Sequence, residues 1–298
     1  MKLDQKGFAL PLILGIALII IVISGSIVVG TRQKLKTAWG VKNRSFAYVA
    51  TYSTLNKVIF NLLTSTPTEY GINLQTAVEG EATWWNLYGD PIDLGNGVTI
   101  SLRDRAGMIS PLFDKQLMQS VLTAYLSDPN QAPSLVDTLD DWQDRDDFKR
   151  LNGAESWDYR LESLAYEPRN FYIQTLEELK LLKDVSSESY DQIKDDLIYW
   201  GGGHKNYLTM SRKTLQGLLG NDDLVENLIE MRKLGQLNST DFEAMTGLIT
   251  SETYLPMPSG WIKVEITAKH EDTVDHLETV ISTQQYIDKP FLVTEWKR

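Results

Sequence analysis

The chain has 298 residues, no cysteine and a formal net charge of −11. Its length suits one large or two modest domains, and the missing thiols exclude disulfides and thiolate metal sites. The charge is uneven: residues 1–44 hold seven Lys or Arg and one acid, or +6, so the rest of the chain carries −17. Phosphates would repel so acidic a globular part, which argues against nucleic acid as a partner.

An apolar run of 23 residues, Phe8 to Gly30, contains no ionisable side chain. As a helix rising about 1.5 Å per residue, the run would be roughly 34 Å long, enough to cross a bilayer core of about 30 Å. We therefore predict a transmembrane helix over residues 8–30. An ordinary signal anchor also explains the run. A secretory signal peptide fits poorly, because no small-residue cleavage site follows the run.

The junction Lys6-Gly7-Phe8 favours a more specific interpretation. A short charged leader that ends in Gly, followed by Phe and an apolar helix, resembles the class III signal of type IV pilins and type II secretion pseudopilins. The resemblance implies that a prepilin peptidase cuts between Gly7 and Phe8, and that the new N-terminal Phe8 is methylated. Most pilins carry Glu at the fifth mature position, whereas this chain has Leu12. A carboxylate in the bilayer is costly unless it is paired, so Leu12 suggests either a tip subunit without a neighbour above it or a protein outside the pilins.

Residues 31–65 continue the helical pattern as a stalk. Apolar side chains recur at spacings of three and four and predict a stripe that packs on a domain: Tyr48, Val49, Tyr52, Leu55, Val58, Ile59 and Leu62. Lys34, Lys36 and Arg44 are unusual for the exported side of a membrane. Anionic headgroups or acidic neighbours could balance their charge.

Strand patterns surround a helical middle region. Alternating apolar residues predict strands at 95–102, 261–268, 278–287 and 290–296, and Lys263, Glu265 and Lys297 predict a solvated sheet face. Helical patterns fill the region between, with predicted capping boxes at Thr175–Glu178 and Thr240–Glu243. We predict an α+β fold: a pilin-like long N-terminal helix plus antiparallel sheet, with a large all-α domain inserted between strands. The predicted segments are a leader (1–7), a transmembrane helix (8–30), a stalk (31–65), a sheet domain (66–111 and 251–298) and an inserted helical domain (112–250).

The most distinctive local sequence is the acidic segment 135–159. It has eight acids in 22 positions: Asp137, Asp140, Asp141, Asp144, Asp146, Asp147, Glu155 and Asp158. Asp144 to Asp147 fall where a helix should end, and acids there oppose the helix dipole and require a cation. Arg145, Lys149 or Arg150 could supply that cation, and so could calcium, which takes oxygen ligands from acidic loops. A solvated acidic face with local ion pairs is equally consistent with the pattern.

Four sequence blocks in this region occur in an order that resembles the K subunit of type II secretion minor pseudopilins. The blocks are Asp141-Trp142-Gln143-Asp144-Arg145-Asp146, Gly153-Ala154-Glu155, Tyr166-Glu167-Pro168-Arg169-Asn170 and Thr175-Leu176-Glu177-Glu178-Leu179. The final Phe291-Leu292-Val293 with Trp296 is also similar to that family.

This resemblance implies a non-catalytic subunit at the tip of the pseudopilus, which helps to initiate assembly with minor pseudopilins I and J for export of folded proteins across the outer membrane. It also implies a single pass through the bacterial inner membrane, a globular part in the periplasm, and structural calcium. By position, the candidate calcium ligands are Asp141, Asp144, Asp146 and Glu155.

Two alternatives stay open. The histidines, His204, His270 and His276, belong to no hydrolase or metalloprotease motif, and the chain has no phosphate loop, so a membrane-anchored enzyme has little support. A minor pilin of a type IV pilus or related system fits the same features, because the sequence does not separate the two machines.

Overall fold

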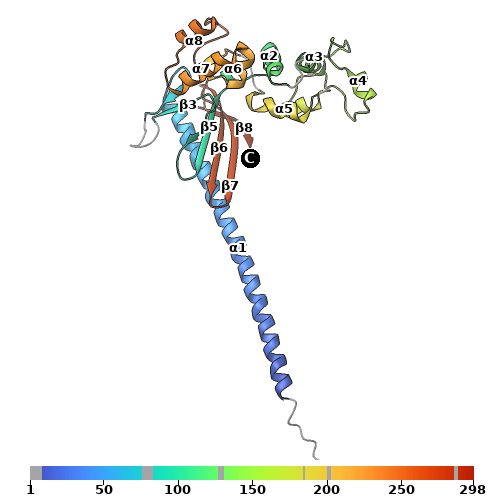
Figure 1. Ribbon diagram of the computed structural model, residues 1–298, viewed down its shortest axis with the longest axis vertical. Coiled ribbons are helices and arrows are strands. Elements are labelled where there is room, and N and C mark those ends of the chain that lie inside the picture. Colours follow the sequence, from blue (N-terminus) through green and yellow to red (C-terminus); the bar gives the residue numbers. More distant parts are fainter. Residues whose placement is uncertain (1–8, 76–82, 127–130, 184, 200–202, 285–287) are drawn as a thin grey trace, which may run out of the picture.

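The computed structural model describes residues 9–75, 83–126, 131–183, 185–199, 203–284 and 288–298 (Figure 1). Its first element, α1 (Ala9–Thr64), is one continuous helix of 56 residues. At the usual helical rise its length is about 84 Å. The predicted transmembrane and stalk segments therefore form a single helix. Within the described part of the chain, α1 is the one helix long and apolar enough to cross a membrane. Gly7 and Phe8 lie outside the described residues.

The C-terminal half of α1 packs on a sheet, but the predicted contact stripe is wrong at its start. Leu55 and Val58 are buried as expected. Tyr48, Val49 and Tyr52 are exposed, and the residues that face the sheet there are small or polar: Ala47, Thr51 and Thr54. Small side chains let the helix backbone lie close to the strands β6 (Trp261–His270) and β7 (Thr273–Ser282), which α1 contacts. The half-exposed rings of Tyr48 and Tyr52 lie at the edge of this contact, where they meet Arg298 and Trp296.

Two antiparallel sheets follow α1. One has the order β1 (Thr66–Pro67), β2 (Gly71–Asn73), β3 (Trp84–Asn86); the other runs β4 (Ile92–Asp93), β5 (Val98–Asp104), β6 (Trp261–His270), β7 (Thr273–Ser282), β8 (Leu292–Lys297). Val98, Ile100 and Leu102 of β5 alternate into a core shared with Leu55 and Val58 of α1. This part of the fold confirms the predicted helix-on-sheet arrangement.

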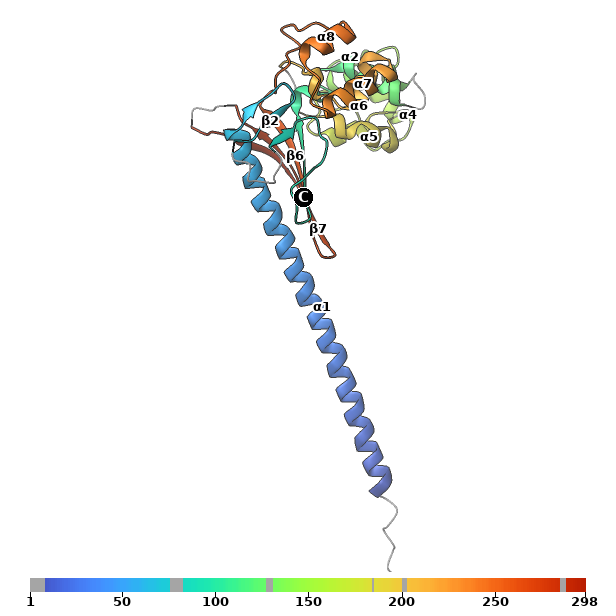
Figure 2. The same cartoon turned by 60° about the vertical axis from the view of Figure 1, so that its left-hand side comes forward.

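The chain between β5 and β6 is helical, as predicted. Its α-helices are α2 (Lys115–Tyr125), α3 (Gln131–Gln143), α4 (Ser156–Leu161), α5 (Ser187–Ile193), α6 (Arg212–Leu219), α7 (Asp222–Lys233) and α8 (Ser239–Thr246). Short 3-10 helices are η1 (Arg105–Gly107), η2 (Leu176–Leu181), η3 (Lys194–Asp196) and η4 (Tyr207–Thr209). In Figure 1, α7 and α8 lie above the strands, whereas α2, α3 and α4 extend to one side, and both views place α4 at the outer edge of the helical region (Figures 1 and 2).

This helical region has two hydrophobic cores, which we call the first and second lobes. The first lobe, residues 109–197, buries Leu139, Trp142 and Tyr159 with side chains of α2 and α5. The second lobe, residues 207–248, buries side chains of η4 and α6–α8 together with two tyrosines of the sheet domain, Tyr70 and Tyr88. Helices α2 and α6 join the lobes.

Polar contacts tie together the two chain crossings between sheet and insertion. At the end of β5, Asp104 is fully buried, and its Oδ1 accepts hydrogen bonds from the Ser259 backbone N–H (3.0 Å) and hydroxyl (2.5 Å). Burial raises the pKa of Asp104 to about 6. The Asn206 N–H donates to the Ala106 carbonyl at 2.9 Å. The bonds between Asp104 and Ser259 thus hold together the two chain segments that flank the insertion, and the bond from Asn206 ties the middle of the insertion to its start.

Part of the predicted solvated sheet face is covered. Lys263 is buried and pairs with Glu265 (3.2 Å) and Glu278 (3.5 Å). Lys297 of β8 reaches Glu177 of the first lobe at 3.3 Å. The prediction is wrong at Lys263 because the insertion lies over this end of the sheet, a contact between segments far apart in sequence.

Both predicted capping boxes are also wrong, although helices begin nearby. Glu178 does not cap Thr175; its carboxylate accepts from the Gln174 N–H (2.8 Å) and Arg169 (2.7 Å). Helix α8 begins two residues before Thr240, at the N-cap Asn238. Glu243 instead accepts a hydrogen bond from the Thr250 N–H at 2.7 Å.

Candidate functional site

The acidic segment folds around one fully buried carboxylate, Asp141. Helix α3 ends at Gln143, and the chain then turns back toward α4. The Arg150 guanidinium donates from Nη1 to Asp141 Oδ1 (2.7 Å) and to Asp144 Oδ2 (2.5 Å). The backbone at Gly153 lies very close to the Asp141 side chain, so that a Cβ added to Gly153 would be 1.9 Å from Asp141 Oδ2. Glycine is therefore required at this position.

Glu155 lies beside these charges without a counter-charge of its own. Its side chain belongs to a residue only 4% exposed, and neither carboxylate oxygen has a hydrogen-bond partner in the structure. Oδ1 of Asp144 is buried and unpartnered in the same way. Burial, and next the negative charge of Asp141 and Asp144, raise the pKa of Glu155 to about 7. The cluster thus holds more negative charge than Arg150 neutralises.

The structure buries two of the four predicted metal ligands, Asp141 and Glu155, and leaves Asp146 exposed at the edge of the cluster. Asp141 and Asp144 share Arg150, and their charges act on Glu155. Asp146 is exposed, and its Oδ1 accepts a hydrogen bond from the Phe148 N–H at 2.9 Å. Among the described residues, no group of three or more His, Cys, Asp or Glu is arranged to hold a metal ion. Arg150 Nη1 already bridges Asp141 and Asp144.

Of the local cations considered from sequence, two have identified carboxylate partners. Arg150 forms ion pairs with Asp141 and Asp144, and Lys149 pairs with Asp158 at 2.7 Å. Asp158 also accepts from the Glu155 N–H (3.0 Å), which fixes the start of α4. Sequence reasoning missed the role of Asp140, which pairs with Lys115 of α2; no motif links residues 25 positions apart.

The sequence blocks that carry the family resemblance contact one another. The Trp142 carbonyl accepts from the Asn170 N–H at 3.0 Å, and Arg169 pairs with Glu178 at 2.7 Å. Beneath the acidic segment, the Trp142 ring centroid lies 5.8 Å from that of Tyr159. Trp142 belongs to the core of the first lobe, since the residue is 2% exposed. These blocks form one structural unit around the acidic cluster.

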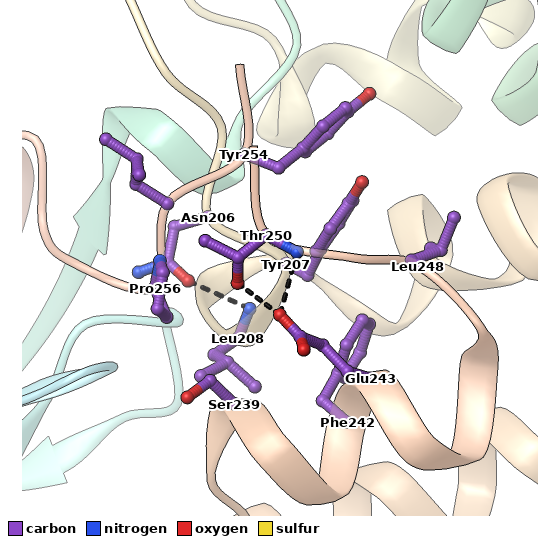
Figure 3. Close-up of a pocket in the computed structure, with 11 residues that line it drawn as sticks. Asn206, Tyr207, Leu208, Ser239, Phe242, Glu243, Leu248, Thr250, Tyr254 and Pro256 are labelled. Atoms are coloured by element: carbon purple, nitrogen blue, oxygen red, sulfur yellow. Dashed lines mark hydrogen bonds between the residues drawn. The ribbon is translucent and has the colours of Figure 1, made fainter. Parts of the chain in front are cut away.

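A second recessed site lies in the second lobe (Figure 3). The Tyr207 ring stacks between Tyr254 (centroids 4.2 Å apart) and Phe242 (5.2 Å). Glu243, on its wall, already accepts hydrogen bonds from Thr250, shown dashed in Figure 3. Its polar groups are thus engaged within the chain, and the pocket is best explained as a packing seam that fastens residues 250–256 to η4 and α8.

The fold and site together define a class of protein. A continuous N-terminal helix leaves an apolar run free and then docks on an antiparallel sheet, which is the pilin-like arrangement predicted from sequence. A two-lobed helical insertion with a buried acidic cluster interrupts the sheet between β5 and β6. The chain is therefore a pilin-like protein with a large helical insertion.

Comparisons with known proteins match one part of the chain to a family and most of the chain to a known fold. Residues 104–198, which span the first lobe, match the family model for Type II secretion system (T2SS), protein K. A chain of the GspK-GspI-GspJ complex from enterotoxigenic Escherichia coli has the same fold, with a TM-score of 0.52, 12% identity, and coverage of 90% of this chain and 98% of that chain. A comparison with curated proteins found no match. The predicted resemblance to protein K is thus supported by the family model over residues 104–198 and by a shared fold over most of the chain.

Proposed function

We propose that this chain is the minor pseudopilin at the tip of the type II secretion pseudopilus, and that it helps to initiate assembly with the minor pseudopilins I and J. The observation that carries the proposal is the pilin-like helix and sheet joined to an insertion that matches protein K. In the solved Escherichia coli complex, GspK is bound together with GspI and GspJ. The proposed role of the assembled filament is export of folded proteins across the outer membrane.

The shape of the insertion supports a tip position. The two lobes lie at the end of the molecule opposite the apolar run and extend to one side (Figure 1). A subunit stacked above would have to avoid this bulk. Leu12 agrees with the same position, since a carboxylate there would need a partner from a subunit above. Both features suit a subunit that has filament neighbours toward its apolar run and none above the insertion.

The proposed maturation is cleavage between Gly7 and Phe8 by a prepilin peptidase, followed by N-methylation of Phe8. The apolar run of α1, whose large side chains are exposed throughout, then anchors the chain by a single pass in the inner membrane. The globular part lies in the periplasm. A Gly7→Val variant should retain Met1 in intact-mass spectra, whereas Gln5→Ala, in the same leader, should be processed normally. Processing of both variants would contradict the assigned cleavage site.

The assembly role is tested by co-expression with I and J. The processed chain should co-purify with both subunits from detergent-solubilised membranes. Leu12→Glu should reduce pseudopilus assembly, because it introduces an unpaired carboxylate into the apolar run. Normal assembly of Leu12→Glu would contradict the tip argument. Failure of a correctly processed chain to bind I and J would favour the alternative of a minor pilin in a type IV pilus or related system.

We also propose that calcium supplements Arg150 in the acidic cluster, with Asp141, Asp144 and Glu155 as the main ligands and Asp146 as an outer one. The donor chemistry fits calcium, which takes carboxylate oxygens, and three buried oxygens of Asp144 and Glu155 have no partner. Calorimetric titration with calcium should give binding that Glu155→Gln weakens at least tenfold. The matched control is Glu188→Gln, an exposed acid of α5. Equal affinities in both variants would exclude Glu155 as a ligand.

A further inference from the structure

A group of basic side chains on α1 lies just beyond the apolar run and has no role in the fold. Arg32, Lys34 and Lys36 are all exposed. The ion pairs among the described residues include none of these three. The helix carries no Asp or Glu anywhere between residues 9 and 64, so no neighbour one turn away can neutralise them. Three exposed cations in five residues, without an ion pair in the described part of the chain, are therefore available to a partner outside the chain.

The three cations surround the helix instead of forming a stripe. At about 100° per residue, Arg32 and Lys36 lie about 40° apart, and Lys34 is about 160° from each. The region is free of the globular part, because the first buried side chain of α1 is Ala47. Figure 2 shows this length of α1 standing clear of the sheet. A partner protein docked on one face would leave Arg32 and Lys36, or Lys34, without a counter-charge.

The depth of these cations matches the headgroup layer. Headgroups add roughly 5–8 Å on each side of the hydrocarbon core. Arg32 to Lys36 lie about 3–9 Å beyond Gly30 along the helix. Two further cations, Lys42 and Arg44, lie about 18–21 Å beyond it, and Lys42 already rests over the Trp39 ring at 4.8 Å. Headgroup contact is therefore expected for the first three cations and not for the last two.

The geometry points to a ring of anionic lipid headgroups bound by Arg32, Lys34 and Lys36 on the exported side of the membrane. This inference rests on the membrane placement proposed above. Lipid phosphates can approach a helix from every side, which suits cations distributed around it. Bound in this way, the ring sets how far α1 sinks into the bilayer and must be released when the subunit is drawn into a filament.

The test uses the processed full chain in mixed bicelles that contain phosphatidylcholine and phosphatidylglycerol in equal amounts. Native mass spectrometry then identifies the lipids that stay bound. The wild-type chain should retain phosphatidylglycerol over phosphatidylcholine by about fivefold or more, the preference expected for a basic side chain at an anionic surface. Arg32→Gln/Lys36→Gln should lose most of this preference, and adding Lys34→Gln should abolish it.

The matched control is Lys42→Gln/Arg44→Gln, which removes one Lys and one Arg from the same helix but beyond headgroup reach. It should keep the wild-type preference. Equal loss in both double variants, or no preference in the wild type, would overturn the inference. Loss of I and J binding in Arg32→Gln/Lys36→Gln, with lipid preference unchanged, would assign the cations to an acidic protein partner instead. Protease protection of α1 in phosphatidylcholine vesicles is measured in parallel; if it is absent, the membrane anchor itself fails.

Discussion

The two lobes of the insertion are stabilised in different ways. In the second lobe, helices begin at side-chain caps: Ser211, Asn221 and Asn238 each accept a hydrogen bond from the backbone three residues on. In the first lobe, α3 and α4 are joined by a loop whose shape depends on buried carboxylates and Arg150. Hydrogen-bonded caps thus start the helices of the second lobe, whereas buried charged groups fix the loop between two helices of the first lobe. Substitutions that affect one lobe and spare the other test this difference.

The largest effect is expected for Gly153→Ala in the first lobe. The new methyl carbon would lie 1.9 Å from Asp141 Oδ2 and 3.2 Å from the Asp137 carbonyl. The buried carboxylate would have to move and lose its bonds to Arg150, at a cost of about 3 kcal/mol or more in unfolding free energy. Hydrogen exchange measured by mass spectrometry should increase over residues 131–161.

The control is the same substitution in the second lobe, Gly220→Ala. This residue has φ +61° but open space around its Cα, so the cost is backbone strain of about 1 kcal/mol. If Gly153→Ala were no more destabilising than Gly220→Ala, the close approach to Asp141 would not determine the fold of the loop.

Arg232→Met should destabilise the second lobe more than any loss of a cap. The buried Arg232 guanidinium lies 4.0 Å from the Tyr88 ring centroid and donates from Nη1 to the carbonyls of Leu208 (3.1 Å) and Met210 (2.7 Å). Burial lowers the pKa of Arg232 to about 10, which still leaves it charged at neutral pH. Methionine fills a similar volume but leaves two buried carbonyls unpaired, a loss of about 2–3 kcal/mol.

Hydrogen exchange should show which part of the chain Arg232→Met destabilises. Exchange over residues 207–246 should rise, and exchange over residues 131–161 should stay near the wild-type rate. A uniform rise across both segments would show that the lobes unfold as one unit, and the comparison drawn from their separate cores would then be wrong.

The third prediction concerns pH in the absence of calcium. The folded-state pKa of Glu155, about 7, lies above its ordinary value of 4.5, so the folded chain holds a proton that the unfolded chain releases. The contribution of this proton to the free energy of unfolding is complete below about pH 4.5 and is lost as the pH rises through 7. With a chelator present, the wild-type chain should lose about 2 kcal/mol between pH 5 and pH 8.

Glu155→Gln removes the proton of Glu155, so its stability should fall less than that of the wild type over that range; the loss that remains comes from Asp104, whose pKa is also raised, to about 6. Calcium should reverse the wild-type trend, because the carboxylate must lose its proton to bind the metal. Thermal melts at pH 5, 6, 7 and 8, with and without calcium, measure both effects. A wild-type chain without calcium that is most stable at pH 8 would contradict the raised pKa.

The sequence was informative where a pattern is local. The apolar run and the helical periodicity predicted one long helix, and alternation in Val98, Ile100 and Leu102 predicted a strand that lines the core. The acidic segment was correctly located, but its neutralisation by Arg150 and the burial of Glu155 arise from the turn at Gly153. Lys263 was placed on a solvated face because nothing nearby reveals that the insertion covers it. Contacts across long sequence separations were therefore the features that local patterns could not predict.

The smallest effect is expected at the start of α8, where Asn238→Ala is compared with Thr240→Ala. Asn238 Oδ1 accepts from the Asp241 N–H (2.9 Å) and its Nδ2 donates to Asp241 Oδ2 (2.7 Å). Losing this cap should cost about 1 kcal/mol. Thr240, which the sequence pattern suggested as the cap, is exposed in the first turn. Alanine has the better helix propensity there, so Thr240→Ala should be neutral or slightly stabilising. Chemical denaturation of the two variants measures both values. If Thr240→Ala were the more destabilising change, α8 would begin where the local sequence pattern had placed it, and the cap assigned to Asn238 would be wrong.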